Sequence, residues 1–284
     1  MKKNILIVGC GDVGSETGKA LQAMGHGVFG IKRTPVEGFP FTCLSADISN
    51  SNSVKHCFQQ LPDDIHFVIY TVAPSERSEG AYRSAYPAGI SEIMGNLDLD
   101  VLEGFLLVTS TAVYHQSQGE WVDELSDTMP ESFSGKILLE AEALLHQRTD
   151  KGVAIRFGGI YGPGRLRLLN KIRQGCELNQ FFPAYTNRIH RDDCARMLVF
   201  LITSMSDGKA VDSCYIGVDS CPSTEWEVLT SIASMLSAEK PVHNEQLVVT
   251  NQNKRCRNSR IRELGFEFTY DSYLQGYQSV IDGM

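Results

Sequence analysis

Residues 4–14 read NILIVGCGDVG, an apolar run from Asn4 to Val8 that leads directly into three glycines. An amphipathic run from Val13 to Met24 follows. Glycines between a strand and a helix allow a tight turn and let the backbone approach a pyrophosphate, and the helix N-terminus supplies N–H groups to it. The stretch therefore predicts a dinucleotide-binding loop; the alternative is a glycine-rich turn that binds nothing. The expected contacts are Gly9, Gly11, Asp12, Val13 and Gly14.

The same alternation continues through the first half of the chain. Helical patterns such as Val54, Phe58 and Leu61, and later Ile137, Leu138, Ala141 and Leu145, separate short runs that favour β-structure. Strands that alternate with helices form a parallel sheet with both faces covered. We therefore predict an α/β fold, a Rossmann-like doubly wound parallel sheet. Its further strands are expected at residues 28–31, 41–44, 66–71, 105–109 and 153–157.

After Phe157 the pattern loosens into a glycine-rich stretch that ends at Arg165. A helical stripe then follows Asp192 or Asp193 as a cap, residues 211–218 read as a strand, and Thr224 with Glu227 forms a capping box. We expect a nucleotide-binding Rossmann domain over residues 1–157. A smaller C-terminal α/β substrate lobe is expected over residues 158–284, partly interleaved with the first domain.

Composition excludes several classes of protein. The 284-residue chain is 42% apolar, which suits a folded core, and its net charge of −8 disfavours nucleic acid or an anionic membrane as partner. No early apolar run is long enough for a signal peptide or a membrane span, so a cytoplasmic protein is expected. The eight cysteines form no CxxC pair and are expected to be reduced thiols, and no metal site is expected.

Lys32 and Arg33 indicate which dinucleotide binds. NAD-binding folds usually carry an acidic residue about 20 positions after the glycines, where its carboxylate accepts hydrogen bonds from the ribose 2′-hydroxyl. This chain has cations there, and a guanidinium suits a phosphate. The prediction is NADP, with NAD as the second choice. The alternative is a pair of solvated surface cations.

Four further segments, together with the loop, resemble the extended short-chain dehydrogenase/reductase superfamily in its NAD-dependent epimerase/dehydratase branch. The closing segment, residues 254–266, also resembles that family's C-terminal end. The strength of the resemblance lies in the order and spacing of these motifs over nearly the whole chain. The four segments are TSTAVY at 109–114, SGKILLEAE at 134–142, RFGGIYGPG at 156–164 and NRIHRDD at 187–193.

The resemblance assigns roles to Ser110 and Lys136. In this family a Ser at the position of Ser110 orients the substrate, and a Lys at the position of Lys136 holds the nicotinamide ribose. That Lys also lowers the pKa of a Tyr four residues earlier, which is the general acid/base, but Ser132 stands there in this chain. SxxxK thus replaces YxxxK. The loop departs too, because Val8 occupies the position of the family's first glycine, and such changes resemble the atypical members of the superfamily.

These departures leave two functions open. In the first, the chain is an NADP-dependent epimerase, dehydratase or reductase acting on a sugar nucleotide or similar polar metabolite, with Tyr114, Tyr161 or a bound water moving the proton. In the second, it binds NADP(H) without turnover as a redox-sensing or scaffold protein. Ser110 and Lys136 favour the first function, and Ser132 favours the second. The resemblance also implies a homodimer through the helix that carries Lys136.

The remaining expected contacts follow from the same resemblance. Asp47 stands where the family contacts the adenine amino group, although it could instead cap the helix that begins near Ser51. Ala73 and Pro74 follow a strand at which the family backbone runs beside the adenosine and pyrophosphate. The candidate substrate residues are Thr111, His115, Arg165, His190 and Arg255. His190 could instead have a structural role, and the cations around Arg255 could instead form a solvated helix face.

Overall fold

The computed structural model describes residues 2–34, 38–181, 184–247 and 252–284, which form two compact units. The expected domains were 1–157 and 158–284, partly interleaved. In this division 114–128 and Phe157 belong to unit 2, and 195–215 belongs to unit 1. Unit 1 comprises Met1–Val113, Met129–Arg156 and Ala195–Tyr215. Unit 2 comprises Tyr114–Thr128, Phe157–Cys194 and Ile216–Met284.

A seven-stranded sheet in the order β12-β7-β5-β4-β1-β2-β3 forms the centre of unit 1. From the neighbouring strands β1 and β4 at its centre, the strand order runs outward in both directions. The strands of four neighbouring pairs are parallel: β1–β2, β1–β4, β2–β3 and β4–β5. The predicted doubly wound Rossmann-like sheet is confirmed, and this reversal of strand order is where such sheets bind ligands. The strands are β1 (Asn4–Val8), β2 (Gly27–Lys32), β3 (Thr42–Ser45), β4 (Phe67–Tyr70), β5 (Gly104–Ser110), β7 (Gly152–Phe157) and β12 (Cys214–Gly217).

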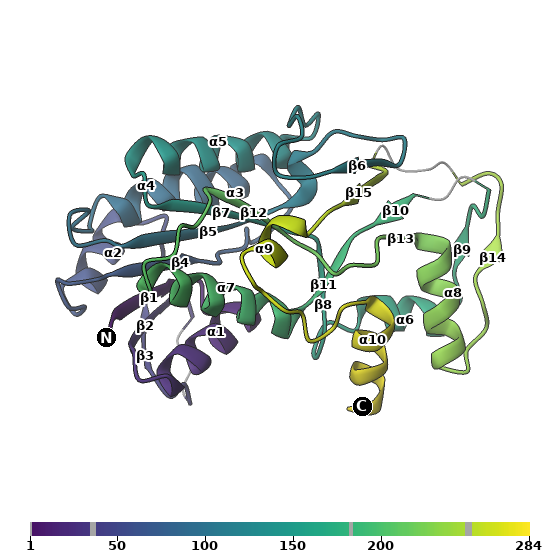
Figure 1. Ribbon diagram of the computed structural model, residues 1–284, viewed down its shortest axis with the longest axis horizontal. Coiled ribbons are helices and arrows are strands. Elements are labelled where there is room, and N and C mark those ends of the chain that lie inside the picture. The colour runs from purple at the N-terminus through teal and green to yellow at the C-terminus, as the bar shows by residue number, and fades with distance from the viewer. Residues whose placement is uncertain (1, 35–37, 182–183, 248–251) are drawn as a thin grey trace. The chain divides into compact units, whose positions relative to one another are not determined.

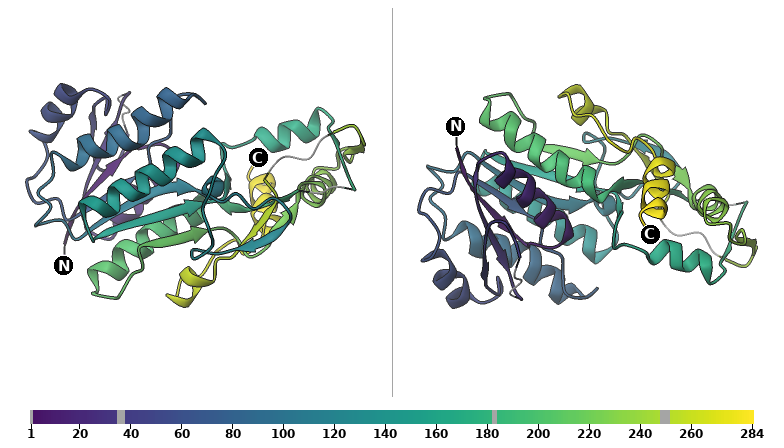
Figure 2. Two further views of the ribbon diagram at one scale, coloured as in Figure 1. Left: turned by 90° about the horizontal axis from the view of Figure 1, so that it is seen from above. Right: turned by 90° about the horizontal axis from the view of Figure 1, so that it is seen from below.

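Helices cover both faces of this sheet. Figures 1 and 2 show α1 (Asp12–Ala23) and α7 (Arg191–Ser206) on one face, with α4 (Gly89–Met94) and α5 (Phe133–Arg148) on the other. Burial from both sides explains why β4 and the Ile5–Val8 part of β1 consist of fully buried apolar side chains. The remaining elements of unit 1 are α2 (Ser51–Phe58), α3 (Glu79–Arg83), the π-helical turn η1 (Ser84–Ala88) and the 3₁₀ turn η2 (Thr111–Val113).

Over the residues that the structure describes, unit 2 contains four two-stranded sheets and four whole helices. Its apolar core lies among α6, α8 and α10 and includes Leu169, Ile232 and Tyr277. The capping box predicted for Thr224 and Glu227 is confirmed at the start of α8. The pairs are β6 (Glu120–Val122) with β15 (Lys254–Cys256), β8 (Gly159–Tyr161) with β11 (Arg188–His190), β9 (Glu177–Leu178) with β14 (Val242–His243), and β10 (Tyr185–Thr186) with β13 (Ser223–Thr224). The helices are α6 (Arg167–Arg173), α8 (Glu225–Met235), α9 (Ser259–Glu263) and α10 (Tyr273–Asp282).

Three local expectations were wrong. Helix α7 begins at Arg191, so Asp192 and Asp193 lie in its first turn instead of capping it. Asn50, not Asp47, caps α2, because its side chain accepts the Ser53 N–H at 3.0 Å. The cations around Arg255 do not share one helix face, because β15 ends at Cys256 and α9 begins only at Ser259. None of the helices within the described ranges is long and apolar enough to cross a lipid bilayer.

Candidate functional site

The glycine loop joins β1 to α1 at the carboxyl edge of the sheet. Gly9 has φ +97°, and a Cβ there would lie 2.8 Å from Val72 N, while a Cβ on Gly14 would lie 2.5 Å from Gly9 O. These two glycines are therefore required by the turn itself and by the close approach of α1 to the sheet. Gly11 differs, because no heavy atom lies within 4 Å of a Cβ built there. The loop thus leaves open space in front of the α1 N-terminus.

This open space fits a pyrophosphate. Gly11 is the N-cap residue of α1 and offers no capping side chain, so an external anion can take the place of a cap at this end. One N–H of the first turn is already used, since Val13 N donates to Asp12 Oδ1 at 3.0 Å. The Asp12 carboxylate therefore competes with a phosphate for this helix end instead of adding a donor. The Gly11 N–H is used as well, since it donates to Gly9 O at 2.8 Å, so the Gly11 position offers a dinucleotide space and not a donor.

The ends of β2 and β3 place a cation and a carboxylate near each other. Asp47 Oδ1 accepts hydrogen bonds from the Ser49 hydroxyl at 2.7 Å and from the Ser49 N–H at 3.0 Å. These bonds lower the pKa of the Asp47 carboxyl, and the nearby Arg33 guanidinium lowers it further. Arg33 is exposed and Lys32 is half-buried. Ala73 and Pro74 follow the end of β4 in an irregular segment. The expected contacts at Gly9, Arg33, Asp47 and Ala73 therefore follow the carboxyl ends of neighbouring parallel strands, whereas Lys136 lies on α5.

Ser132 has a structural role at the start of α5. Its Oγ accepts the Gly135 N–H at 3.2 Å and a hydrogen bond from the Ser134 hydroxyl at 3.3 Å, so Ser132 is the N-cap of the helix. An N-cap of this kind contributes about 1 kcal/mol to stability. Lys136 lies one turn further along, with an exposed side chain. A serine here serves the helix, and its hydroxyl is a far weaker acid than a phenol with a lowered pKa.

The start of α5 lies against the segment that carries Ser110 and Thr111. A Cβ on Gly135 would lie 2.6 Å from Ala112 O, so only glycine permits this approach. Ser110 ends β5, and its Oγ accepts the Ala112 N–H at 3.2 Å. Thr111 is buried in the turn η2. Sequence reasoning missed Gly135, although a glycine in the first turn of a predicted helix is a signal of close packing.

A buried ion pair holds the other side of α5 to the sheet. Arg156 Nη2 on β7 lies 2.6 Å from Glu142 Oε2 on α5, and Glu142 Oε1 accepts a hydrogen bond from the Thr109 hydroxyl at 2.7 Å. Both charged side chains are almost fully buried. Since Thr109 precedes Ser110, the network fixes β5 and α5 relative to each other at the predicted catalytic residues. The sequence signal for this ion pair is that Glu142 and Arg156 are charged residues within apolar segments.

The remaining candidate substrate residues lie in unit 2. Arg255 Nε donates to Gly119 O at 2.7 Å, and its guanidinium stacks on Trp121 and Tyr185 at 4.9 and 4.8 Å from the ring centroids. His115 is half-buried, and Arg165 is exposed in the turn after β8. Arg255 therefore already has partners within its own unit.

His190 is a core histidine of unit 2. Only 1% of it is exposed, its Nδ1 accepts the Asp192 N–H at 3.2 Å, and its ring packs between Tyr161 and Tyr270. Burial lowers its pKa, so the ring is neutral at pH 7. The structural alternative for His190 fits these contacts.

The two tyrosines considered as substitute proton donors are both buried in unit 2. Tyr161 stacks on Tyr277 with ring centroids 4.3 Å apart, and a Cβ on Gly276 would clash with its hydroxyl oxygen. Burial raises the pKa of Tyr161 far above that of an ordinary phenol. Tyr114 is fully buried. Tyr161 therefore does not fit a general acid at neutral pH.

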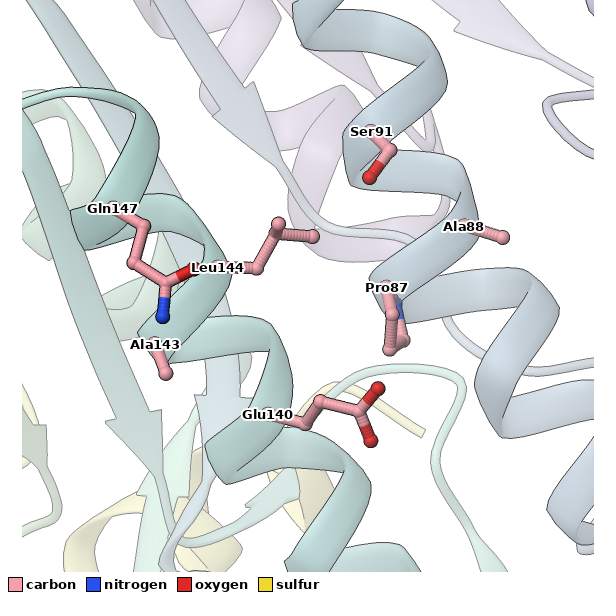
Figure 3. A pocket seen from close by; sticks show the side chains of 7 residues that line it. All are labelled: Pro87, Ala88, Ser91, Glu140, Ala143, Leu144 and Gln147. Carbon is pink, nitrogen blue, oxygen red and sulfur yellow. The ribbon is translucent and has the colours of Figure 1, made fainter.

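A groove of about 490 Å³ lies between α5 and the η1–α4 segment (Figure 3). Its one ionisable side chain, Glu140, pairs with Arg83 at 2.9 Å. No predicted site residue lines it. Its lining residues are Pro87, Ala88, Ser91, Glu140, Ala143, Leu144 and Gln147. Within the part of the chain that the structure describes, no three His, Cys, Asp or Glu side chains group as a metal site.

Comparison with known proteins places the chain in a family. No family model and no curated protein matches it. A solved structure from Methylobacillus flagellatus, assigned as an NAD-dependent epimerase/dehydratase, is 31% identical over 100% of this chain and 99% of that chain, with a TM-score of 0.85.

Two more distant structures share the fold. The human epimerase family protein SDR39U1, solved with NADPH, is 16% identical over 99% of this chain and 100% of that chain, with a TM-score of 0.79. A UDP-glucose 4-epimerase of Thermus thermophilus, solved with NAD, is 14% identical over 98% of each chain, with a TM-score of 0.79. The order of motifs, the doubly wound sheet and the 31% identity over the full length lead to one conclusion: the chain belongs to the NAD-dependent epimerase/dehydratase family of the extended short-chain dehydrogenase/reductase superfamily.

Proposed function

We propose that the chain binds NADP(H) in unit 1 and acts as an epimerase, dehydratase or reductase on a sugar nucleotide or a similar polar metabolite. The observation that carries this proposal is the open space at Gly11 in front of α1, on a loop whose other two glycines are required by the turn. The nucleotides named for the human and Thermus structures, and the UDP-glucose with NAD named for MoeE5, support it by analogy of fold.

Each residue of the proposed site has a physical role. The open space at Gly11 would receive the pyrophosphate. Arg33 would contact the 2′-phosphate and Asp47 the adenine amino group, while the Lys136 ammonium would hold the ribose. When bound, the nicotinamide supplies hydride transfer. Ser110 would orient the reacting hydroxyl or carbonyl of the substrate.

A second candidate function is NADP(H) binding without turnover. It is favoured by Ser132, whose hydroxyl caps α5, and by the burial of Tyr161 and Tyr114. No phenol stands four residues before Lys136 to exchange a proton with substrate. In this function, the redox state of the bound nucleotide would be the signal that the protein reports.

The cation at the end of β2 predicts a preference for the phosphorylated cofactor. We expect NADPH to bind about 10- to 100-fold more tightly than NADH, because a charge-assisted bond to the 2′-phosphate contributes about 1.5–3 kcal/mol. Arg33→Ala should remove most of this preference and leave NADH affinity nearly unchanged. Calorimetric titration of both nucleotides into both proteins measures the effect.

Lys55→Ala serves as the matched control, since it removes a cation from the exposed surface of α2. It should leave the ratio of the two affinities unchanged. Equal affinities for NADPH and NADH in the wild type would contradict the assignment of Arg33.

Ser132→Tyr tests whether the family's catalytic arrangement is otherwise intact. We expect the wild type to oxidise UDP-glucose and other nucleoside diphosphate sugars with NADP slowly or not at all. In the variant, a phenol one turn before Lys136 should raise turnover at least about tenfold, since general acid–base catalysis contributes about 10²–10⁴-fold. Absorbance of the reduced nicotinamide is the readout, and the double variant with Lys136→Ala is the blank.

The outcomes separate the two functions. A fast wild-type rate that is lost in Ser110→Ala and Lys136→Ala would show that another group replaces the tyrosine, and binding without turnover would be wrong. No gain in a folded Ser132→Tyr protein that still binds NADPH would favour binding without turnover.

A further inference from the structure

The glycine loop carries a thiol that meets a second thiol behind the nucleotide site. Cys10 lies between Gly9 and Gly11, and Cys43 lies on β3, where it pairs in register with Gly30 of β2. The two side chains are hydrogen-bonded to each other. A Cβ on Gly30 would lie 2.5 Å from Cys10 Sγ and 3.3 Å from Cys43 Sγ. The glycine on the intervening strand thus makes the space in which the two sulfurs meet.

The two thiols differ in exposure. Cys10 is 1% exposed and also contacts Ile7 O at 3.6 Å through Sγ, whereas Cys43 is half-buried. Burial raises the pKa of both thiols, and the Lys32 ammonium, which lies near both, partly offsets this. Cys43 is therefore the thiol that an oxidant reaches first, and Cys10 is the neighbouring thiol that can form a disulfide with the oxidised Cys43.

We propose that Cys10 and Cys43 form an oxidisable dithiol that couples the redox state of its surroundings to the nucleotide loop. The oxidant is a peroxide. The Cys43 thiolate attacks one peroxide oxygen and breaks the O–O bond, which yields a sulfenic acid and, with one proton, a water or an alcohol. The Cys10 sulfur then displaces the sulfenic oxygen as a second water, forming the disulfide. Two thiols lose two electrons and two protons in total, and the peroxide gains them.

Closure of this disulfide would act on the Gly9–Gly11 turn. A disulfide holds its sulfurs about 2.05 Å apart, which is shorter than any contact between two thiols. Cys10, Cys43 or both must therefore move, and any movement of Cys10 shifts the glycines that flank it. This consequence rests on the proposed function, because it assumes that the turn holds the nucleotide. By thermodynamic linkage, bound NADPH then disfavours disulfide formation by the same factor by which the disulfide weakens NADPH binding.

The test oxidises the whole protein with hydrogen peroxide, blocks remaining thiols and maps the peptides by mass spectrometry. We expect a Cys10–Cys43 linkage that dithiothreitol reverses, and an NADPH Kd raised about tenfold by oxidation, within the usual range of coupling. Because the thiolate is the nucleophile, the rate of linkage should rise with pH. Cys57 is the matched control, since it is a buried thiol near Cys43 but lies on α2, away from the loop.

Cysteine-to-alanine variants identify which two thiols form the linkage. Cys57→Ala should form the linkage as the wild type does, and Cys10→Ala and Cys43→Ala should not. Absence of the linkage in the wild type, or a Cys43–Cys57 linkage in its place, would overturn the proposal. A linkage with unchanged NADPH affinity would overturn the coupling. If the reduced protein binds no NADPH while the linkage forms, the proposed function fails and the dithiol stands.

Discussion

Gly11→Asp is expected to abolish NADPH binding while the protein stays folded. The space around a Cβ at this position is open, so the substitution meets no protein atom and leaves the turn at Gly9 and Gly14 intact. A carboxylate there would occupy the place proposed for the pyrophosphate and repel it. Like charges in contact cost several kcal/mol, which corresponds to a loss of affinity of about 100-fold or more.

Calorimetric titration with NADPH measures this loss, and thermal unfolding followed by circular dichroism confirms the fold. Ala20→Asp is the matched control, because it adds the same charge to an exposed position of the same helix. It should bind NADPH like the wild type. Wild-type affinity in Gly11→Asp would show that the loop is not the nucleotide site.

Arg156→Met is expected to destabilise the protein by about 3–5 kcal/mol, because breaking a buried ion pair leaves an uncompensated charge in the core. The Glu142 carboxylate would keep only the Thr109 hydroxyl among the partners described above. Urea unfolding of variant and wild type gives the difference in the free energy of unfolding. NADPH affinity should also fall, because the network holds α5, and with it Lys136, against β5.

Two further variants test whether the loss of stability comes from the buried Arg156–Glu142 ion pair. Replacing both partners, Glu142→Leu with Arg156→Met, should recover most of the lost stability, since an apolar pair of similar volume is often neutral. Lys19→Met removes one partner of the exposed pair with Glu16 and should cost under about 1 kcal/mol. Equal losses in Arg156→Met and Lys19→Met would contradict the role given to this pair.

The sequence predicted the sheet well because its signals are local. The apolar runs at β1, β2, β4, β5 and β7 lie within a few residues of their observed bounds, since strands buried on both faces must be apolar throughout. The capping box of α8 was found for the same reason, because both of its partners lie within four residues. Helix ends were less predictable: Asn50 and not Asp47 caps α2, and α7 begins before the expected aspartates.

The site was predicted only where its chemistry is local. The glycine loop, Lys32 and Arg33 could be recognised from spacing alone. The contacts of Arg156, Cys43 and Gly135 could not, because their partners lie on other strands and helices that only the fold brings near. Ser132 shows another limit: its spacing to Lys136 drew attention to a missing phenol, whereas its hydroxyl has a role of its own as a helix cap.

A crystal structure of the protein grown with NADPH would show whether the glycine loop holds the dinucleotide. We expect the pyrophosphate beside Gly11 at the N-terminus of α1, and the 2′-phosphate in contact with the Arg33 guanidinium. The same density would show which side chain faces the nicotinamide, with Lys136 at its ribose. NADPH bound elsewhere on the chain, or a 2′-phosphate turned away from Arg33 into solvent, would contradict the account given for the glycine loop and its cations.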